Sequence, residues 1–236
     1  CAVLDFFSGS GTTAHAVMNL NAEDDGNRQF IMVQLPEATA EDSEAYKAGY
    51  KDICEIGKER IRRAGAQIQA EWQAKMTQRE RERERENNAA PNTGIPTLDT
   101  GFRVFRLDSS NYEDVSRPPK NYTQTTLDLF EDNIKPNRTD LDLLFGAMLA
   151  WGVTLDLPMT SETVDGCTIH TVNNGDLVAC FSPGITEKVV SAIAAKHPLR
   201  VLFRDSCFTQ DSQKINLYEQ FKQQLDWSDD EAFQNI

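Results

Sequence analysis

The sequence has few of the residues that hold metal ions or grip nucleic acids. Its 236 residues include three histidines and five scattered cysteines, none of them spaced as Cys-x-x-Cys, so a zinc site has no framework. Lys and Arg number 24 against 37 Asp and Glu, which gives a formal net charge of -13. A domain whose main task is binding phosphates usually has a basic face, because counterion release drives that binding. We therefore expect the main DNA-binding surface of any DNA-handling assembly to lie outside these residues.

Long apolar runs are also missing. No run approaches the roughly 20 residues that would span a bilayer, and the first residues do not resemble a signal peptide. An odd number of scattered cysteines without an export signal is typical of reduced thiols in a cytoplasm, so we expect a cytoplasmic protein without membrane contact. With 39% apolar and 26% charged residues, the composition is that of one large or two modest globular domains.

The chain begins with a β-strand pattern instead of an initiator methionine. The apolar strand at 1–4 leads through a glycine-containing turn into a helix with regularly spaced apolar residues. A polar loop at 21–28 then leads to a second apolar strand at 30–33. This order predicts one βαβ unit of a mostly parallel sheet. Because a protein rarely begins inside a strand, we expect the chain to be the C-terminal piece of a longer polypeptide.

A long helix follows, with apolar residues about one turn apart from Tyr50 to Trp72. Residues 79–86 then alternate strictly between Arg and Glu, so attraction at i,i+3 offsets repulsion at i,i+4. We interpret this stretch as a solvated helix end that frays into a linker at 87–100. We expect a first domain at 1–75, the charged helix end and linker at 76–100, and a small α/β module at 101–236.

The second region contains a clear hairpin signal, because Asn-Gly at 174–175 is the favoured type I′ turn. This turn places Ile169 opposite Cys180, so a disulfide between Cys167 and Cys180 is not expected. The other expected elements of this region are a strand at 101–107, an extended arm at 112–137, a helix at 141–151, a helix capped by Thr186, a strand at 199–203 and a helix from Asp211.

The turn at 5–13 is the one site with recognisable chemistry. A glycine turn between a parallel strand and a helix lets a ligand approach the backbone and points free amide groups at it. The phosphate-loop motif is excluded because no Lys-Ser/Thr pair follows Gly11. Ala14 leaves a dinucleotide fingerprint open, but a carboxylate at Asp5 would repel a pyrophosphate. The same carboxylate could attract the ammonium group of an amino-acid moiety, and Phe6 or Phe7 could stack on a purine; we expect one of these two rings to be in the core.

The sequence Asp-Phe-Phe-Ser-Gly-Ser-Gly-Thr-Thr at 5–13 resembles the S-adenosylmethionine-binding motif of DNA amino-methyltransferases in which this motif follows the catalytic one. Four further segments, at 27–37, 50–63, 101–110 and 201–206, are similar to the modification subunit of type III restriction–modification systems. The resemblance implies an α/β fold, with part of a Rossmann-like methyltransferase sheet followed by a small C-terminal α/β module.

The resemblance also implies which residues would bind the cofactor. The turn would line the methionine and adenine parts, and the ribose contact is left open between Gln34 and Glu37, because Gln34 stands where the family usually has an acid. The expected S-adenosylmethionine-binding residues are Asp5, Phe6, Phe7, Gly9, Ser10, Gly11, Thr12, Thr13, Gln34 and Glu37.

The catalytic tetrad of this family, (Asp/Asn)-Pro-Pro-(Tyr/Phe), is absent from these residues. The tetrad and the target-recognition region lie upstream in such subunits. We therefore expect a fragment of an adenine-N6 methyltransferase that is inactive alone, with DNA, a helicase–nuclease restriction subunit and a second modification subunit as partners. The alternatives are a non-catalytic assembly module and, less favoured, a nicotinamide-dependent oxidoreductase fragment.

Overall fold

The computed structural model describes residues 1–87, 98–113, 133–208, 210–225 and 233–235. It divides into two compact units, Cys1–Val104 and Phe105–Ile236. Each contains helices and strands, which confirms a mixed α/β chain. In the described ranges, no helix is long and apolar enough to cross a membrane.

The N-terminal unit is built on one parallel strand pair. Strands β1 (Ala2–Asp5) and β2 (Gln29–Met32) pair in register from Ala2 opposite Gln29 to Asp5 opposite Met32. Helix α1 (Thr12–Asp24) connects them, as parallel strands require a crossover. The predicted βαβ unit is confirmed, whereas a larger Rossmann-like sheet stays a prediction, since this sheet has two strands among the described residues.

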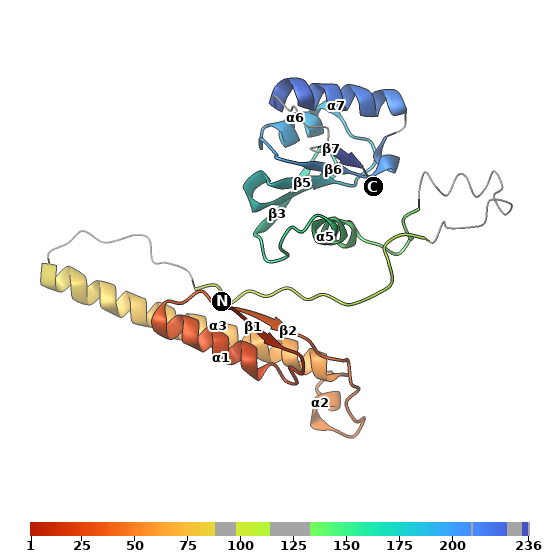
Figure 1. Cartoon of the computed structure of the whole chain (residues 1–236). Helices are drawn as coiled ribbons and strands as arrows, with labels where there is room; N and C mark the ends of the chain where they lie inside the picture. The colour runs from red at the N-terminus through yellow and green to blue at the C-terminus, as the bar shows by residue number, and fades with distance from the viewer. Residues whose placement is uncertain (88–97, 114–132, 209, 226–232, 236) are drawn as a thin grey trace. The chain divides into compact units, whose positions relative to one another are not determined.

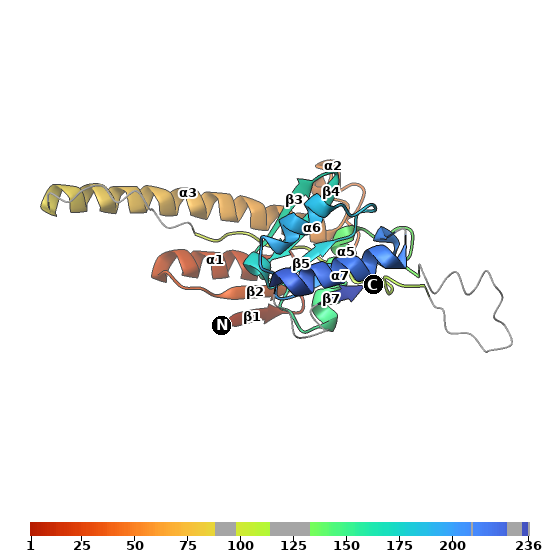
Figure 2. The same ribbon diagram turned by 90° about the horizontal axis from the view of Figure 1, so that it is seen from above.

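Helix α3 (Ile53–Asn87) lies alongside α1 and follows the short helix α2 (Glu44–Lys47) (Figures 1 and 2). Small residues allow the close approach of the two long helices: Ala14 of α1 and Ala64 of α3 are almost fully buried. Apolar side chains complete this core, from Met18, Ile61 and Ile68, with Phe30 and Phe102 packed against it.

One predicted boundary in this unit was wrong and another was confirmed. Helix α1 continues to Asp24, into the stretch expected to be a polar loop, because Asn21 is buried and accepts a hydrogen bond from the Arg28 backbone N–H at 3.0 Å. Helix α3 continues to Asn87, so the charged stretch at 79–86 is helical, as expected. The proposed division at 75 and 100 stays a prediction.

The predicted strand at 101–107 was also wrong, because this segment is extended but pairs with no described strand. Its apolar residues pack individually. Phe102 joins the α3 core beneath the Arg62 guanidinium, 5.8 Å from the ring centroid. The Phe105 ring packs edge-on against Phe145, 5.0 Å between centroids.

The C-terminal unit is a mixed five-stranded sheet in the order β3-β4-β5-β6-β7. Its first two pairs are antiparallel and its last two are parallel. The elements are α5 (Asp140–Ala150), β3 (Met159–Val164), β4 (Cys167–Val172), the 3₁₀ turn η2 (Asn173–Gly175), β5 (Leu177–Cys180), α6 (Glu187–Ala194), β6 (Val201–Phe203), the 3₁₀ turn η3 (Asp205–Cys207), α7 (Asp211–Leu225) and β7 (Phe233–Asn235).

Helices cover both faces of this sheet (Figure 1). Side chains alternate along each strand, so Val201 and Phe203 of β6 face α6 and α7, whereas Leu202 faces α5. Burial raises the pKa of the Cys180 thiol to about 12 and that of the Cys207 thiol to about 11. These two thiols are therefore core residues and not nucleophiles at neutral pH.

The predicted hairpin register is confirmed, because Ile169 lies opposite Cys180. Asn174 and Gly175 both have positive φ, 57° and 127°, as a type I′ turn requires. Asn173 is also left-handed, with φ of 46°, and the ladder stops at the pair before it.

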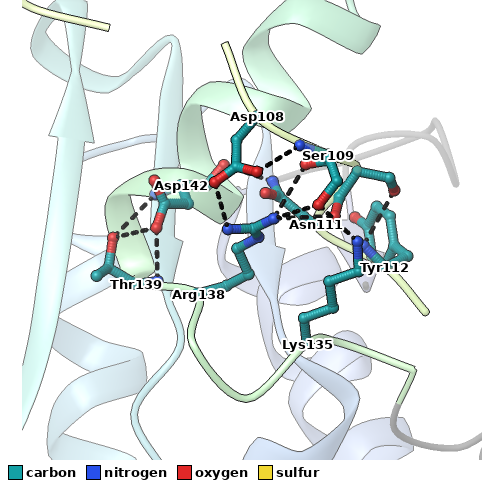
Figure 3. A network of polar contacts seen from close by, with 9 residues as sticks. Asp108, Ser109, Asn111, Tyr112, Lys135, Arg138, Thr139 and Asp142 are labelled. Carbon is teal, nitrogen blue, oxygen red and sulfur yellow. Dashed lines mark hydrogen bonds and ion pairs between the residues drawn. The ribbon is translucent and has the colours of Figure 1, made fainter. Parts of the chain in front are cut away.

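A network of polar contacts joins the segment at 108–112 to the residues at the start of α5 (Figure 3). The Arg138 guanidinium, whose side chain is 8% exposed, contacts Asp108 at 3.3 Å and donates to the Ser109 carbonyl at 3.0 Å. Thr139 and Asp142 form a capping box on α5. The expected extended arm lies mostly outside the described residues; at its ends, Tyr112 and Ile134 form an isolated antiparallel bridge.

Candidate functional site

The turn that joins β1 to α1 lies at the carboxyl ends of the two parallel strands. Gly9 and Gly11 have φ of 51° and 77°, in the left-handed region that side chains rarely adopt. The Gly11 amide donates to the Ser8 carbonyl at 2.8 Å, and the Ser8 amide donates to the Val33 carbonyl at 3.1 Å. Ligands of open α/β sheets bind at this edge, and the structure places the predicted residues from Asp5 to Thr13 there.

The first four amide groups of a helix have no partner inside the helix. In α1 these groups include the amides of Thr12 and Thr13, directly after the glycine turn, whereas the His15 amide already donates to the Gly11 carbonyl at 3.3 Å. Thr12 itself is exposed. A helix start that faces solvent in this way can accept oxygen atoms of a ligand.

Asp5 is held at the base of the turn. Its carboxylate accepts hydrogen bonds from the Thr13 hydroxyl at 2.6 Å and from the Phe7 backbone amide at 3.0 Å. The Thr13 hydroxyl and the Phe7 amide lower the pKa of this carboxyl below its ordinary value of 3.8. Asp5 is therefore a fixed negative charge at neutral pH, as an ammonium-binding residue needs to be.

The two aromatic residues of the motif do not enter the core of this chain. Phe6 is 63% exposed and Phe7 is 88% exposed, so the expectation that one of them is buried was wrong. The outward face of the β1–β2 pair is apolar as well, because Leu4 and Ile31 are adjacent and about half exposed. No described helix packs on that face, which explains why the Phe6 and Phe7 rings are exposed.

Gln34 and Glu37, the two candidates for the ribose contact, differ in their surroundings. The Gln34 carboxamide accepts from the Gly9 amide at 2.8 Å and donates to the Leu35 carbonyl at 3.2 Å. Glu37 is exposed, and its backbone carbonyl accepts from the Ile53 amide at 3.0 Å. Gln34 thus belongs to the turn itself, whereas the Glu37 side chain faces solvent.

Helix α3 packs directly against the glycine turn, a contact that reasoning from the sequence missed. A Cβ atom at Gly57 would lie 3.3 Å from the Gly9 carbonyl oxygen, so the helix backbone almost touches the turn. One helical turn later, the Arg60 guanidinium donates to the Ser10 hydroxyl at 3.1 Å. Gly57 was the signal in the sequence that could have indicated this contact, because a glycine inside a helix usually has a packing reason.

Beside α1, a hollow of about 390 Å³ runs along α3 and is lined by His15, Tyr50, Glu59, Arg60 and Arg63, among others. Glu59 and Tyr50 both contact Arg63, at 2.7 Å and 3.2 Å. Nowhere in the part of the chain that the structure describes do three or more His, Cys, Asp or Glu residues gather in a way that could hold a metal ion.

Comparison with known proteins gives this geometry a context. The chain is 45% identical, over 105 residues, to the Mod subunit of the type III restriction–modification enzyme StyLTI from Salmonella typhimurium. It is 56% identical, over 62 residues, to the Mod subunit of the type III enzyme EcoP15I from Escherichia coli. The chain is homologous to part of the type III Mod subunits.

The matched stretches cover 44% and 26% of this chain but only 13% and 10% of those two Mod subunits. The chain is also 44% identical, over 54 residues, to the type II methyltransferase M.KpnI from Klebsiella pneumoniae, covering 23% of this chain and 13% of that protein. No protein-family model matches the chain.

Proposed function

We propose that the chain is part of a Mod subunit that transfers a methyl group from S-adenosylmethionine to adenine N6 in DNA, and that residues 5–13 form part of the cofactor site. The observation that carries this proposal is the Asp5 carboxylate, held ionised beneath a left-handed glycine turn at the start of a helix. The relatives named as Mod subunits and as a methyltransferase support the same reaction class.

The residues of the turn fit such a cofactor chemically. The ionised Asp5 attracts the ammonium group of the methionine part, and the free amides at the start of α1 suit its carboxylate or a hydroxyl oxygen. The exposed ring of Phe6 or Phe7 can cover a purine face. Glu37, whose side chain faces solvent, is the better candidate for the ribose hydroxyls, because the Gln34 carboxamide is already bonded to the turn.

When bound, S-adenosylmethionine would supply an activated methyl group for the adenine amine. The turn would contribute position and charge, which are the main sources of rate in such a direct transfer. The residues that hold the flipped adenine belong to a tetrad outside this chain. We therefore infer that the chain alone is inactive and acts with the rest of the subunit.

The partners in this proposal are DNA, bound mainly by other parts of the subunit, a restriction subunit with helicase and nuclease activities, and a second modification subunit. The net charge of -13 agrees with the placement of the main DNA-binding surface elsewhere. Sequencing the coding region upstream of the Cys1 codon tests the arrangement. An in-frame Asp-Pro-Pro-Tyr-like tetrad followed by a long recognition region supports the methyltransferase, and a start codon directly upstream would favour a non-catalytic assembly module.

The activity is tested in the complete subunit with two matched Asp→Asn variants of the same unit. Asp5→Asn removes the fixed charge beneath the turn, whereas Asp25→Asn changes an exposed residue just after α1. We expect Asp5→Asn to raise the KM for S-adenosylmethionine by roughly tenfold or more, the usual effect of losing a charged hydrogen bond, and Asp25→Asn to leave it unchanged. Equal methylation kinetics for Asp5→Asn and the wild type would refute the assignment.

A further inference from the structure

Arg60 differs from the other basic residues around it on α3. Lys58 pairs with Glu55, and Arg62 and Arg63 both pair with Glu59. The hydrogen bond that the structure gives Arg60 goes instead to the Ser10 hydroxyl, fifty residues earlier in the chain. Ser10 lies between the two left-handed glycines, so the guanidinium holds the tip of the turn.

The backbone of α3 sets the position of this guanidinium. Gly57 lies one helical turn before Arg60, and its missing side chain brings the helix close to the Gly9 carbonyl. From the other side, a Cβ atom at Gly11 would lie 3.3 Å from the Gly57 carbonyl oxygen and 3.2 Å from the Ile61 side chain. The backbones of the turn and the helix therefore lie close together, and the Arg60 side chain lies within hydrogen-bond distance of the Ser10 hydroxyl.

A second side chain holds the turn from the strand side. The Gln34 carboxamide, just after β2, accepts the hydrogen bond of the Gly9 amide at 2.8 Å. Neighbouring residues of the turn, Gly9 and Ser10, are thus fixed by side chains from two different elements. A loop with a pre-set shape binds its ligand more tightly, because less conformational freedom is lost on binding.

We propose that Arg60 and Gln34 are positioning residues of the cofactor site, which hold the glycine turn in its binding shape without contacting the cofactor. This role rests on the proposed function. It also assigns Gln34 to the turn and not to the ribose.

The test is a double-mutant cycle on the Arg60–Ser10 pair in the complete subunit, with the dissociation constant of S-adenosylmethionine measured by calorimetry. The variants are Arg60→Met, Ser10→Ala, the double variant, Arg60→Lys and, as a matched control, Arg62→Met. We expect each of the first two to weaken binding roughly fivefold to tenfold, the range for a lost hydrogen bond. The double variant should bind no more weakly than Ser10→Ala, because Arg60 acts on the site through its bond to Ser10.

Two further results separate positioning from general destabilisation. Arg60→Lys keeps a donor within reach of Ser10 and should recover most of the affinity, and Arg62→Met should bind like the wild type. Additive losses in the double variant would mean that Arg60 acts on the cofactor directly, and that result overturns the proposal. Wild-type affinity in Arg60→Met also overturns it. If the wild-type subunit itself does not bind S-adenosylmethionine, the proposed function fails and this role fails with it.

Discussion

The close fit between the glycine turn and α3 can be tested by adding a single methyl group. In Gly11→Ala, the residue at φ of 77° acquires a Cβ atom 3.2 Å from the Ile61 side chain and 3.3 Å from the Gly57 carbonyl oxygen. The left-handed conformation costs a non-glycine residue about 1–2 kcal/mol, and overpacking adds about 1–3 kcal/mol. Gly49→Ala is the matched control, because Gly49 has φ of 96° but nothing within 4 Å of the added atom.

The free energy of unfolding of the N-terminal unit can be followed through Trp72, which is 5% exposed in α3. In a background where Trp151 and Trp227 are replaced by Phe, urea unfolding monitored by fluorescence reports on this unit. We expect Gly49→Ala to lose about 1–2 kcal/mol, and Gly11→Ala to lose about 2–5 kcal/mol. If Gly11→Ala were no more destabilising than Gly49→Ala, α3 would not pack against the turn as described.

Three further predictions concern single side chains. The pKa of Asp142 lies below 3.8, because the backbone amide and the hydroxyl of Thr139 donate to its carboxylate. The stability that this carboxylate contributes is therefore present above pH 3.8 and is lost as the pH falls through the lower folded-state pKa. The free energy of unfolding of Asp142→Asn, measured in urea, should not show this loss at acid pH. Phe221 lies on α7 and is fully buried in the core beside Phe203, so Phe221→Ala should destabilise the C-terminal unit by about 3–5 kcal/mol, measured by urea unfolding through Trp151. Gln34→Glu keeps an acceptor for the Gly9 amide, so its affinity for S-adenosylmethionine, measured by equilibrium dialysis, should be within about twofold of wild type. A marked gain in affinity would instead make residue 34 a ribose ligand.

The local parts of the fold could be predicted from the sequence. The order strand, glycine turn, helix and strand at the start of the chain is encoded by neighbouring residues, as is the hairpin register that sets Ile169 opposite Cys180. Strand β3 (Met159–Val164) was not predicted, because an edge strand with four exposed residues has no apolar alternation. The segment at 101–107 has a strand-like pattern but pairs with no strand among the described residues, and sequence alone does not show whether a partner is present.

At the candidate site too, local features could be predicted from the sequence and long-range contacts could not. Asp5 and the glycines could be placed from their spacing, since they lie within one strand–turn–helix unit. The contact between Arg60 and Ser10 joins residues fifty positions apart, and no local pattern indicates it. The expected burial of Phe6 or Phe7 failed for a related reason, because burial depends on which elements cover the strand pair and not on the strand itself.

The most direct test of the central claim is to map S-adenosylmethionine onto this chain by NMR, because amide shifts detect even millimolar affinity and locate it. Titration with S-adenosylmethionine should shift the amide signals of residues 5–13 and those near Glu37, while titration with a nicotinamide dinucleotide should leave them unchanged. Shifts caused by the dinucleotide instead would favour the oxidoreductase alternative. No shift at the turn with millimolar S-adenosylmethionine would contradict the claim that this turn is a cofactor site.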